Sequence, residues 1–322
     1  MSGSMWMPTE PPSLARLIGI HLQPVPVVPA IAIALLALYA LGVVVLARRG
    51  DRWPVSRVVW WCAGVISILA VTATGLDGYG MELFSVHMVQ HMVLGMLTPL
   101  LLVMGAPVTL LLRSLSGGSR RQAIRRSVLV VLHSRVMRTL THPLVIVTLF
   151  LFSLYGLYFT PVFDALMSTM WGHNLMLLHF AAVGGLYFWG VLGIDPAPRP
   201  RREIVSAPLR RVLELTVTLP FHAFFGVAVM MSTTLIVGFY AHPIAGWGIR
   251  PLADQQTGGG IAWAFTEIPT LAVLGILFWR AQRSEARMNA RVEARARTRA
   301  DDELGAYNAY LSQLSSPGGG SE

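Results

Sequence analysis

Seven long apolar segments constrain this chain more than any other feature of its sequence. A helix needs about 20 apolar residues to cross the hydrocarbon core of a bilayer. With 54% hydrophobic and 13% charged residues and a mean hydropathy of +0.59, the composition is typical of a membrane protein. The sequence therefore predicts an all-α, polytopic membrane helical bundle. Its seven transmembrane helices are expected at residues 27–47, 57–76, 83–111, 143–160, 173–194, 211–238 and 260–280.

The third segment is not expected to form one straight helix. It contains Pro99 and Pro107. A proline inside a helix removes a backbone hydrogen bond and clashes with the preceding turn. We expect this segment to be kinked, or to end near Met104 and continue along the membrane interface.

The basic residues predict how the bundle is oriented. All 25 are arginine, and all except Arg16 and Arg250 follow the first, third or fifth segment or lie in the tail. Loops on the cytoplasmic side of a membrane carry an excess of arginine and lysine. The N-terminus is therefore expected outside and the C-terminus in the cytoplasm. The expected domains are an extracytoplasmic N-terminal segment (1–26), the seven-helix transmembrane domain (27–281) and a cytoplasmic Arg-rich helical tail (282–322).

Ionisable side chains occur inside four of the apolar segments. An ionisable group within the bilayer is costly and points to a functional site. With a rise of about 1.5 Å per residue and the orientation above, these groups share the outer half of the membrane. They are His87, His91, His173, His179, His222 and Glu267.

The chemistry of these residues favours a metal. His87 and His91 are four residues apart on one helical face, a spacing that suits two imidazoles on one ion. Imidazole together with thioether favours copper, particularly Cu(I), whereas histidines alone leave zinc open. Two histidines on facing helices would also suit haem b. The thioether candidates are Met88, Met92 and Met176, and Glu267 is a candidate ligand, proton carrier or partner that orients a histidine.

Other features exclude several classes of function. The single cysteine, Cys62, excludes an internal disulfide and a thiolate cluster. No catalytic motif is present, so we do not expect an enzyme. The arginines are spread over every cytoplasmic loop, which argues against nucleic-acid binding. Asp254, Gln255 and Gln256 precede Gly258–Gly260 and are expected to form an outer loop that receives cargo.

Several blocks of the sequence resemble one protein family. The segment SVHMVQHMVLGMLTPLLLVMGAPVTLLLR, from Ser85 to Arg113, is similar to the signature of the CtaG-type cytochrome c oxidase assembly proteins. The similarity continues in order over nearly all of residues 27–314. The other blocks start at His173, Leu219, Asp254 and Asp301, and the last two resemble actinobacterial members.

The resemblance implies a seven-helix protein of the bacterial plasma membrane that assembles haem-copper oxidase by delivering copper. By motif, His87, His91, His179 and His222 carry over as the site, with His173 and Glu267 as further candidates. The implied partners are cytochrome c oxidase subunits, the lipid bilayer and an extracytoplasmic copper donor. A haem b redox protein and a copper importer remain the alternatives.

Overall fold

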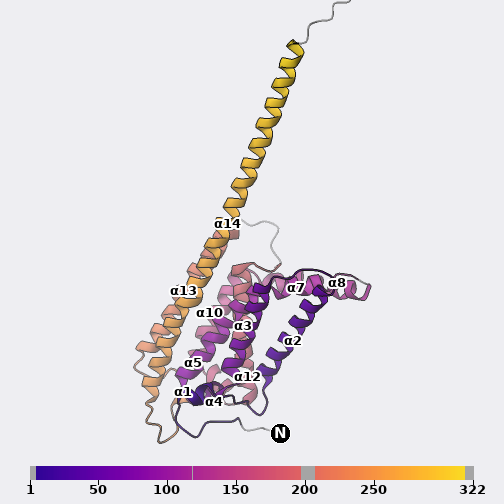
Figure 1. The fold of residues 1–322 in the computed structure, drawn as a ribbon. Helices are drawn as coiled ribbons and strands as arrows, with labels where there is room; N and C mark the ends of the chain where they lie inside the picture. The colour runs from indigo at the N-terminus through magenta and orange to yellow at the C-terminus, as the bar shows by residue number, and fades with distance from the viewer. Residues whose placement is uncertain (1–4, 118, 197–206, 316–322) are drawn as a thin grey trace, which may run out of the picture. The chain divides into compact units, whose positions relative to one another are not determined.

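The computed structural model describes residues 5–117, 119–196 and 207–315 (Figure 1). The regular elements in these ranges are helices, and the only β-type contact there is an isolated bridge between Ile20 and Thr74. The predicted all-α class is therefore confirmed. The chain divides into two compact units, residues 1–273 and 274–322, which are described separately.

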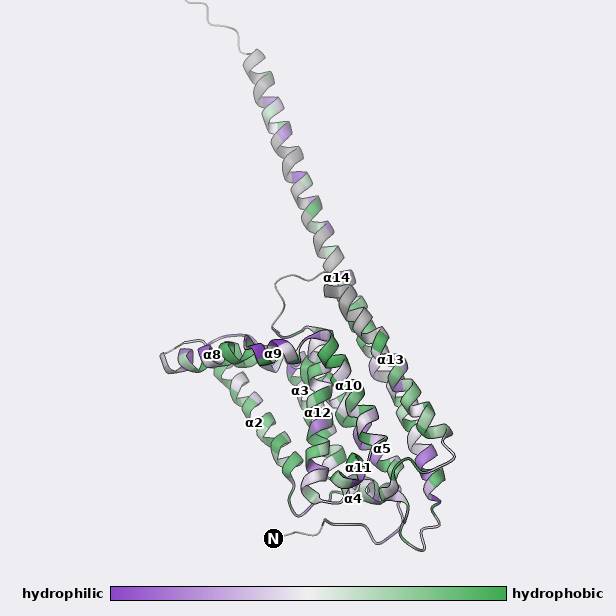
Figure 2. Cartoon of the chain, turned by 180° about the vertical axis from the view of Figure 1, so that it is seen from behind, coloured by the Kyte–Doolittle hydropathy of each residue, from purple (hydrophilic) through white to green (hydrophobic). Residues whose placement is uncertain are grey.

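Apolar helices lie where the sequence predicts membrane spans, and Figure 2 shows hydrophobic residues along them. Five helical runs are long and apolar enough to cross a membrane, and two further apolar helices are shorter. Seven spans and an outside N-terminus remain predictions. The five are α2 (Val27–Ala47), α3 (Val55–Thr72), Phe84–Ser114, α12 (Met170–Leu192) and Pro251–Trp279 of α14 (Pro251–Ser315). The two shorter are α10 (Pro143–Tyr158) and Thr216–Met231 of α13 (Ala207–Met231).

The third predicted segment forms four consecutive helices. They are α5 (Phe84–Met92), a π-helical turn η1 (Val93–Leu97), α6 (Thr98–Met104) and α7 (Pro107–Ser114). Between α6 and α7, Ala106 adopts a left-handed backbone with φ of 52°, which is unusual for a residue other than glycine. The helix therefore breaks after Met104, as predicted, whereas continuation along the membrane interface remains a prediction. The π-helical turn directly follows the predicted histidine pair, and such turns often occur at functional sites.

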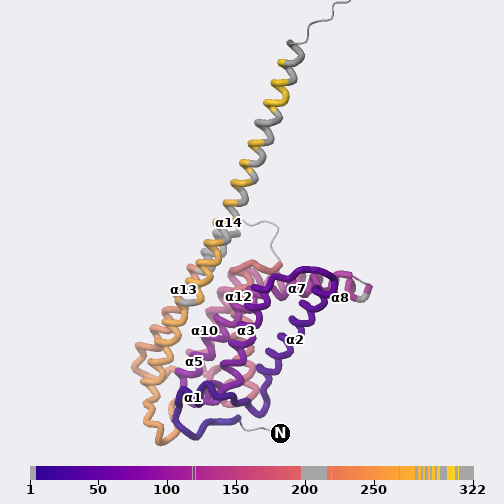
Figure 3. Tube along the Cα trace, in the orientation of Figure 1, coloured from indigo at the N-terminus to yellow at the C-terminus, as the bar shows by residue number. Residues whose placement is uncertain are grey.

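Short helices occupy the connections between the apolar ones. Figure 3 shows α1 and the N-terminal segment at one end of the helices of the first unit, and α7 and α8 at the other end. The short elements are α1 (Leu14–Ile18), α4 (Gly75–Glu82), α8 (Ser119–Leu132), α9 (Arg135–Leu140), α11 (Val162–Met167) and the 3₁₀ turn η2 (Gly238–Tyr240).

The run from α5 to α7 lies at the centre of the first unit. In its most apolar window 56% of the residues are buried, against 17% for α2. Helix α6 packs against both α3 and α12. At the π-helical turn, Gly184 of α12 lies so close to the carbonyl oxygen of Gly95 that a Cβ would overlap it. This close approach brings α12 against the segment that carries the predicted histidine pair.

Two aspartates from distant segments accept hydrogen bonds at the N-termini of α5 and α7, one at each helix. Asp254 of α14 accepts hydrogen bonds from the backbone N–H of Phe84 (2.7 Å) and from the Ser85 hydroxyl. Asp195 accepts hydrogen bonds from the backbone N–H groups of Val108 (3.0 Å) and Thr109 (2.8 Å). Carboxylates at helix N-termini satisfy unpaired N–H groups and interact favourably with the helix dipole.

The position of Asp254 corrects one prediction. Helix α14 begins at Pro251, so Asp254, Gln255 and Gln256 lie in its first turns and do not form an outer loop. Gln255 joins α14 to the segment after α13, because its Oε1 accepts from the backbone N–H of Ile236 at 2.7 Å. Asp254 and Gln255 therefore join α14 to neighbouring segments, which explains why polar residues precede the apolar part of this helix.

In the second unit, residues 274–315 continue α14 as a helix. Over the described residues, the Arg-rich tail from residue 282 is therefore helical. Its cytoplasmic location remains a prediction.

Candidate functional site

Two predicted histidines lie one turn apart on α5, deep in the first unit. His87 is fully buried and His91 is 6% exposed. Between them, Gln90 points away, since its amide donates to the Val71 carbonyl (2.8 Å) and to Asp77 (3.0 Å). Gln90 therefore anchors α5 to its neighbours, while the two imidazoles face another part of the bundle.

A tyrosine hydroxyl joins the two imidazoles. The oxygen of Tyr158, at the end of α10, lies 3.0 Å from Nε2 of His87 and 2.8 Å from Nδ1 of His91. Both distances are those of hydrogen bonds. The second ring nitrogen of His91, Nε2, lies toward Gly95 of the π-helical turn. A Cβ atom added to Gly95 would be 3.9 Å from this nitrogen.

His222 of α13 faces His91 across the bundle. Their ring centroids are 6.4 Å apart and their planes cross at 73°. His222 is 1% exposed, and neither of its ring nitrogens has a hydrogen-bond partner among the described residues. A buried polar atom without a partner costs about 1–3 kcal/mol. A ligand that bonded His222 would remove this cost, so the pair His91 and His222 is the most favourable place for a ligand in the site.

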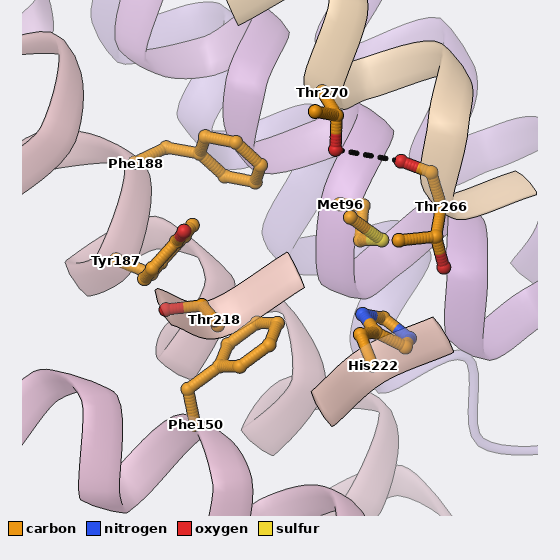
Figure 4. A pocket seen from close by; sticks show the side chains of 8 residues that line it. All are labelled: Met96, Phe150, Tyr187, Phe188, Thr218, His222, Thr266 and Thr270. Carbon is orange, nitrogen blue, oxygen red and sulfur yellow. Dashed lines mark hydrogen bonds between the residues drawn. The ribbon is translucent and has the colours of Figure 1, made fainter. Parts of the chain in front are cut away.

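Two small cavities adjoin these rings. One, of about 20 Å³, is lined by His91 and by Ser153, and the other, of about 10 Å³, is lined by His222. Phe150 borders both. Figure 4 shows the second cavity, where the sulfur of Met96 lies beside His222 and Thr266. Each cavity has room for about one water-sized group.

The other predicted histidines surround this pair. His173 of α12 is 2% exposed, its Nε2 has no hydrogen-bond partner among the described residues, and it lies within electrostatic range of His87. His179 is half-buried, and its Nε2 is 2.7 Å from the Ser153 hydroxyl. His179 also lies within electrostatic range of His91. All five histidines therefore lie in one connected layer.

The layer differs from the prediction in two respects. No three His, Cys, Asp or Glu side chains in the described part of the chain come together as one ion site. Two of the imidazoles, those of His91 and His222, face each other directly. Glu267, expected at the same depth, is exposed, so the structure does not bring it to the histidines. The predicted methionines Met88, Met92 and Met176 are buried.

Sequence patterns did not identify three residues that contact the histidines. Tyr158 stands at the end of an apolar segment with no polar neighbour to mark it. Phe180 stacks on His91 with ring centroids 4.0 Å apart. Met96 follows His91 by five residues, a spacing that a regular α-helix places on another face. The π-helical turn between them changes that register.

A buried carboxyl outside the apolar helices lies beside α5, on the short helix α4. Asp77 of α4 is 5% exposed and bonds Gln90. Burial raises the pKa of this carboxyl from 3.8 to about 7, and the hydrogen bonds from Gln90 and Gln23 oppose that rise. Gln23 in turn holds the N-terminal segment, because it pairs with the backbone N–H and carbonyl of Trp6.

Comparisons with known proteins agree with the resemblance. Residues 37–284 match the family described as cytochrome c oxidase caa3 assembly factor. Uncharacterized proteins of Mycobacterium bovis and Mycobacterium tuberculosis are each 42% identical over 310 residues, and one of Mycobacterium leprae is 40% identical. The matches cover 95% of this chain but 46% of each relative, so the chain spans less than half of their length. No solved structure matches the chain.

Proposed function

This chain belongs to the cytochrome c oxidase caa3 assembly factor family, and from this premise we propose that it carries Cu(I) between His91 and His222 for delivery to the oxidase. The family description, an assembly factor of cytochrome c oxidase, supports the oxidase as the partner. Copper is the cargo in this proposal, because haem-copper oxidase needs it and because the buried donors suit it. The observation that carries the proposal is the facing pair of imidazoles.

The separation of the two rings supports one ion between them. Metal–nitrogen bonds to histidine are about 2.0–2.1 Å long, so two imidazoles on opposite sides of an ion have ring centres about 6 Å apart. The observed separation is 6.4 Å. A metal would also give a partner to His222, whose ring nitrogens have none among the described residues.

The surroundings of the pair favour Cu(I) over the other candidates. Met96 adds a thioether beside His222, and soft thioether ligands select Cu(I). Zinc in proteins takes three or four protein ligands, which the described residues do not bring together. Haem b does not fit, because the cavities beside the two rings measure about 10 and 20 Å³ and are bordered by Phe150.

Metal titration of the purified protein tests binding. We expect the wild type to bind about one Cu(I) in competition with a chromophoric chelator. The double variant His91→Ala/His222→Ala should lose this binding. His133→Ala is the matched control, because His133 is exposed and its Nδ1 bonds the Leu129 carbonyl of α8, the helix that it follows. Stoichiometric binding by the double variant would show that copper is held elsewhere.

Delivery is tested on the oxidase itself. Oxidase purified from cells that carry the double variant should contain less copper than oxidase from wild-type cells, at equal amounts of oxidase protein. The His133→Ala cells provide the reference. Normal copper content together with poor oxidase assembly would instead indicate a scaffolding role.

A further inference from the structure

The Tyr158 hydroxyl contacts two candidate ligands at the same time. Its oxygen bonds Nε2 of His87 and Nδ1 of His91, at 3.0 and 2.8 Å. Tyr158 is 1% exposed, and the rings of Phe163 and Phe225 lie 5.0 and 5.2 Å from its own. Because the side chain is enclosed by apolar groups, bulk water does not substitute for either hydrogen bond.

A phenol has a single proton and can donate to only one of the two imidazoles. If Tyr158 donates to Nε2 of His87, then Nδ1 of His91 must donate to the Tyr158 oxygen. If Tyr158 donates to Nδ1 of His91, then Nε2 of His87 must donate. Two neutral rings therefore both carry their proton on Nδ1, or both carry it on Nε2.

This coupling limits which nitrogens can bind a metal. The first arrangement leaves a free lone pair on Nε2 of His91, and the second leaves one on Nδ1 of His87. A histidine binds a metal through the nitrogen that has no proton. We propose that Tyr158 makes His91 and His87 alternative, and not simultaneous, ligands for one copper ion.

The geometry favours His91 over His87 as the ligand when copper is bound. Its Nε2 lies toward Gly95 and the cavity beside it, and its ring faces His222. Copper between His91 and His222 would favour the arrangement in which His87 accepts the proton of Tyr158. Tyr158 and His87 are then positioning residues that act in series on His91. This inference rests on the proposed function and adds which histidine binds the copper and which residues position that histidine.

The proton positions can be measured without copper. In metal-free protein labelled with ¹⁵N-histidine, ring nitrogen spectra distinguish the two tautomers, and single-histidine replacements assign the signals. We expect His87 and His91 to carry the same tautomer in the wild type and to lose this correlation in Tyr158→Phe. Different tautomers on the two rings of the wild type would overturn the proposal, whatever the protein does with copper.

Copper affinity gives the second readout. Loss of a group that orients a metal ligand lowers affinity by about 10- to 100-fold. We expect Tyr158→Phe and His87→Phe each to weaken Cu(I) binding to this extent. Because the two residues act in series, the double variant should be no weaker than the weaker single variant. If His87 were an independent ligand, the two losses would multiply.

Tyr155→Phe is the matched control. Tyr155 lies one turn earlier on α10, and its hydroxyl donates to the backbone carbonyl of Phe221 at 2.5 Å and to no imidazole among the described residues. This variant should bind Cu(I) within about threefold of the wild type, by the usual size of effects outside the site. A folded Tyr158→Phe protein that binds Cu(I) as tightly as the wild type contradicts the inference. A wild type that binds no Cu(I) contradicts the proposed function, and the tautomer measurement remains valid.

Discussion

Buried polar groups at the helix ends and in the middle of the bundle differ in how many hydrogen bonds they make. At the ends, the carboxyls of Asp254 and Asp195 accept several hydrogen bonds each from helix N-termini. In the middle, His222 has no partner for either ring nitrogen among the described residues. Over the part of the chain that the structure describes, seven buried side-chain atoms lack a hydrogen bond, and four of them belong to histidines of the layer. Saturated polar groups indicate a structural role, whereas unsaturated ones indicate a place for a ligand.

The largest effect on stability is expected from the capping carboxylate on α14. Asp254→Ala removes an acceptor for the N–H of Phe84 and for the N–H and hydroxyl of Ser85. Hydrogen bonds to a charged group contribute about 1.5–3 kcal/mol each, so we expect the loss of these three to lower the unfolding free energy by about 5 kcal/mol. Thermal denaturation in detergent measures it. Asp51→Asn, at an exposed ion pair, is the control and should change stability little. Equal melting temperatures for all three proteins would refute the capping role.

A smaller and pH-dependent effect is expected at Asp77. Below pH 3.8 the carboxyl is protonated in both the folded and the unfolded chain. Between pH 3.8 and about 7 only the unfolded chain ionises, so stability falls as the pH rises through this range and is level above it. The loss is about 1.4 kcal/mol per unit of pKa difference, or about 4 kcal/mol over the whole range. Asp77→Asn should remove this slope in melting curves between pH 4 and 8. Parallel curves for the two proteins would contradict it.

The smallest effect on stability is expected at His222. His222→Leu removes two buried nitrogens that have no hydrogen-bond partner among the described residues and keeps an apolar side chain in their place. Because nothing is left unpaired, stability should stay the same or rise by about 1 kcal/mol. Copper binding should nevertheless be lost. A loss above about 2 kcal/mol in thermal or denaturant unfolding would show that the ring has a structural partner, and the contrast with Asp254 would fail.

Much of the architecture was predictable from the order of apolar residues. Each predicted span contains an apolar helix, and the break near Met104 follows from the prolines in that segment. The common layer of histidines was also predictable, because depth in a helix follows from counting residues. The prediction failed for the outer loop at Asp254, since its polar residues continue a helix and bond another one.

The details of the site were less predictable. Periodicity places a residue on a face of its helix but does not say which neighbour that face meets. Glu267 satisfied the depth criterion and is exposed. Tyr158 gave no signal in the sequence, although it bonds two histidines.

The sequence by itself determined the helical class, the apolar segments and the positions of the histidines along their helices, because these depend on hydropathy and on the fixed rise of a helix. Only the tertiary structure decided which imidazoles face each other, which nitrogens lack a partner and which phenol joins His87 to His91. Those properties depend on the rotation of each helix about its own axis. That rotation is determined by contacts between helices, such as Gly184 against Gly95 and the π-helical turn of η1, which no local pattern in the chain encodes.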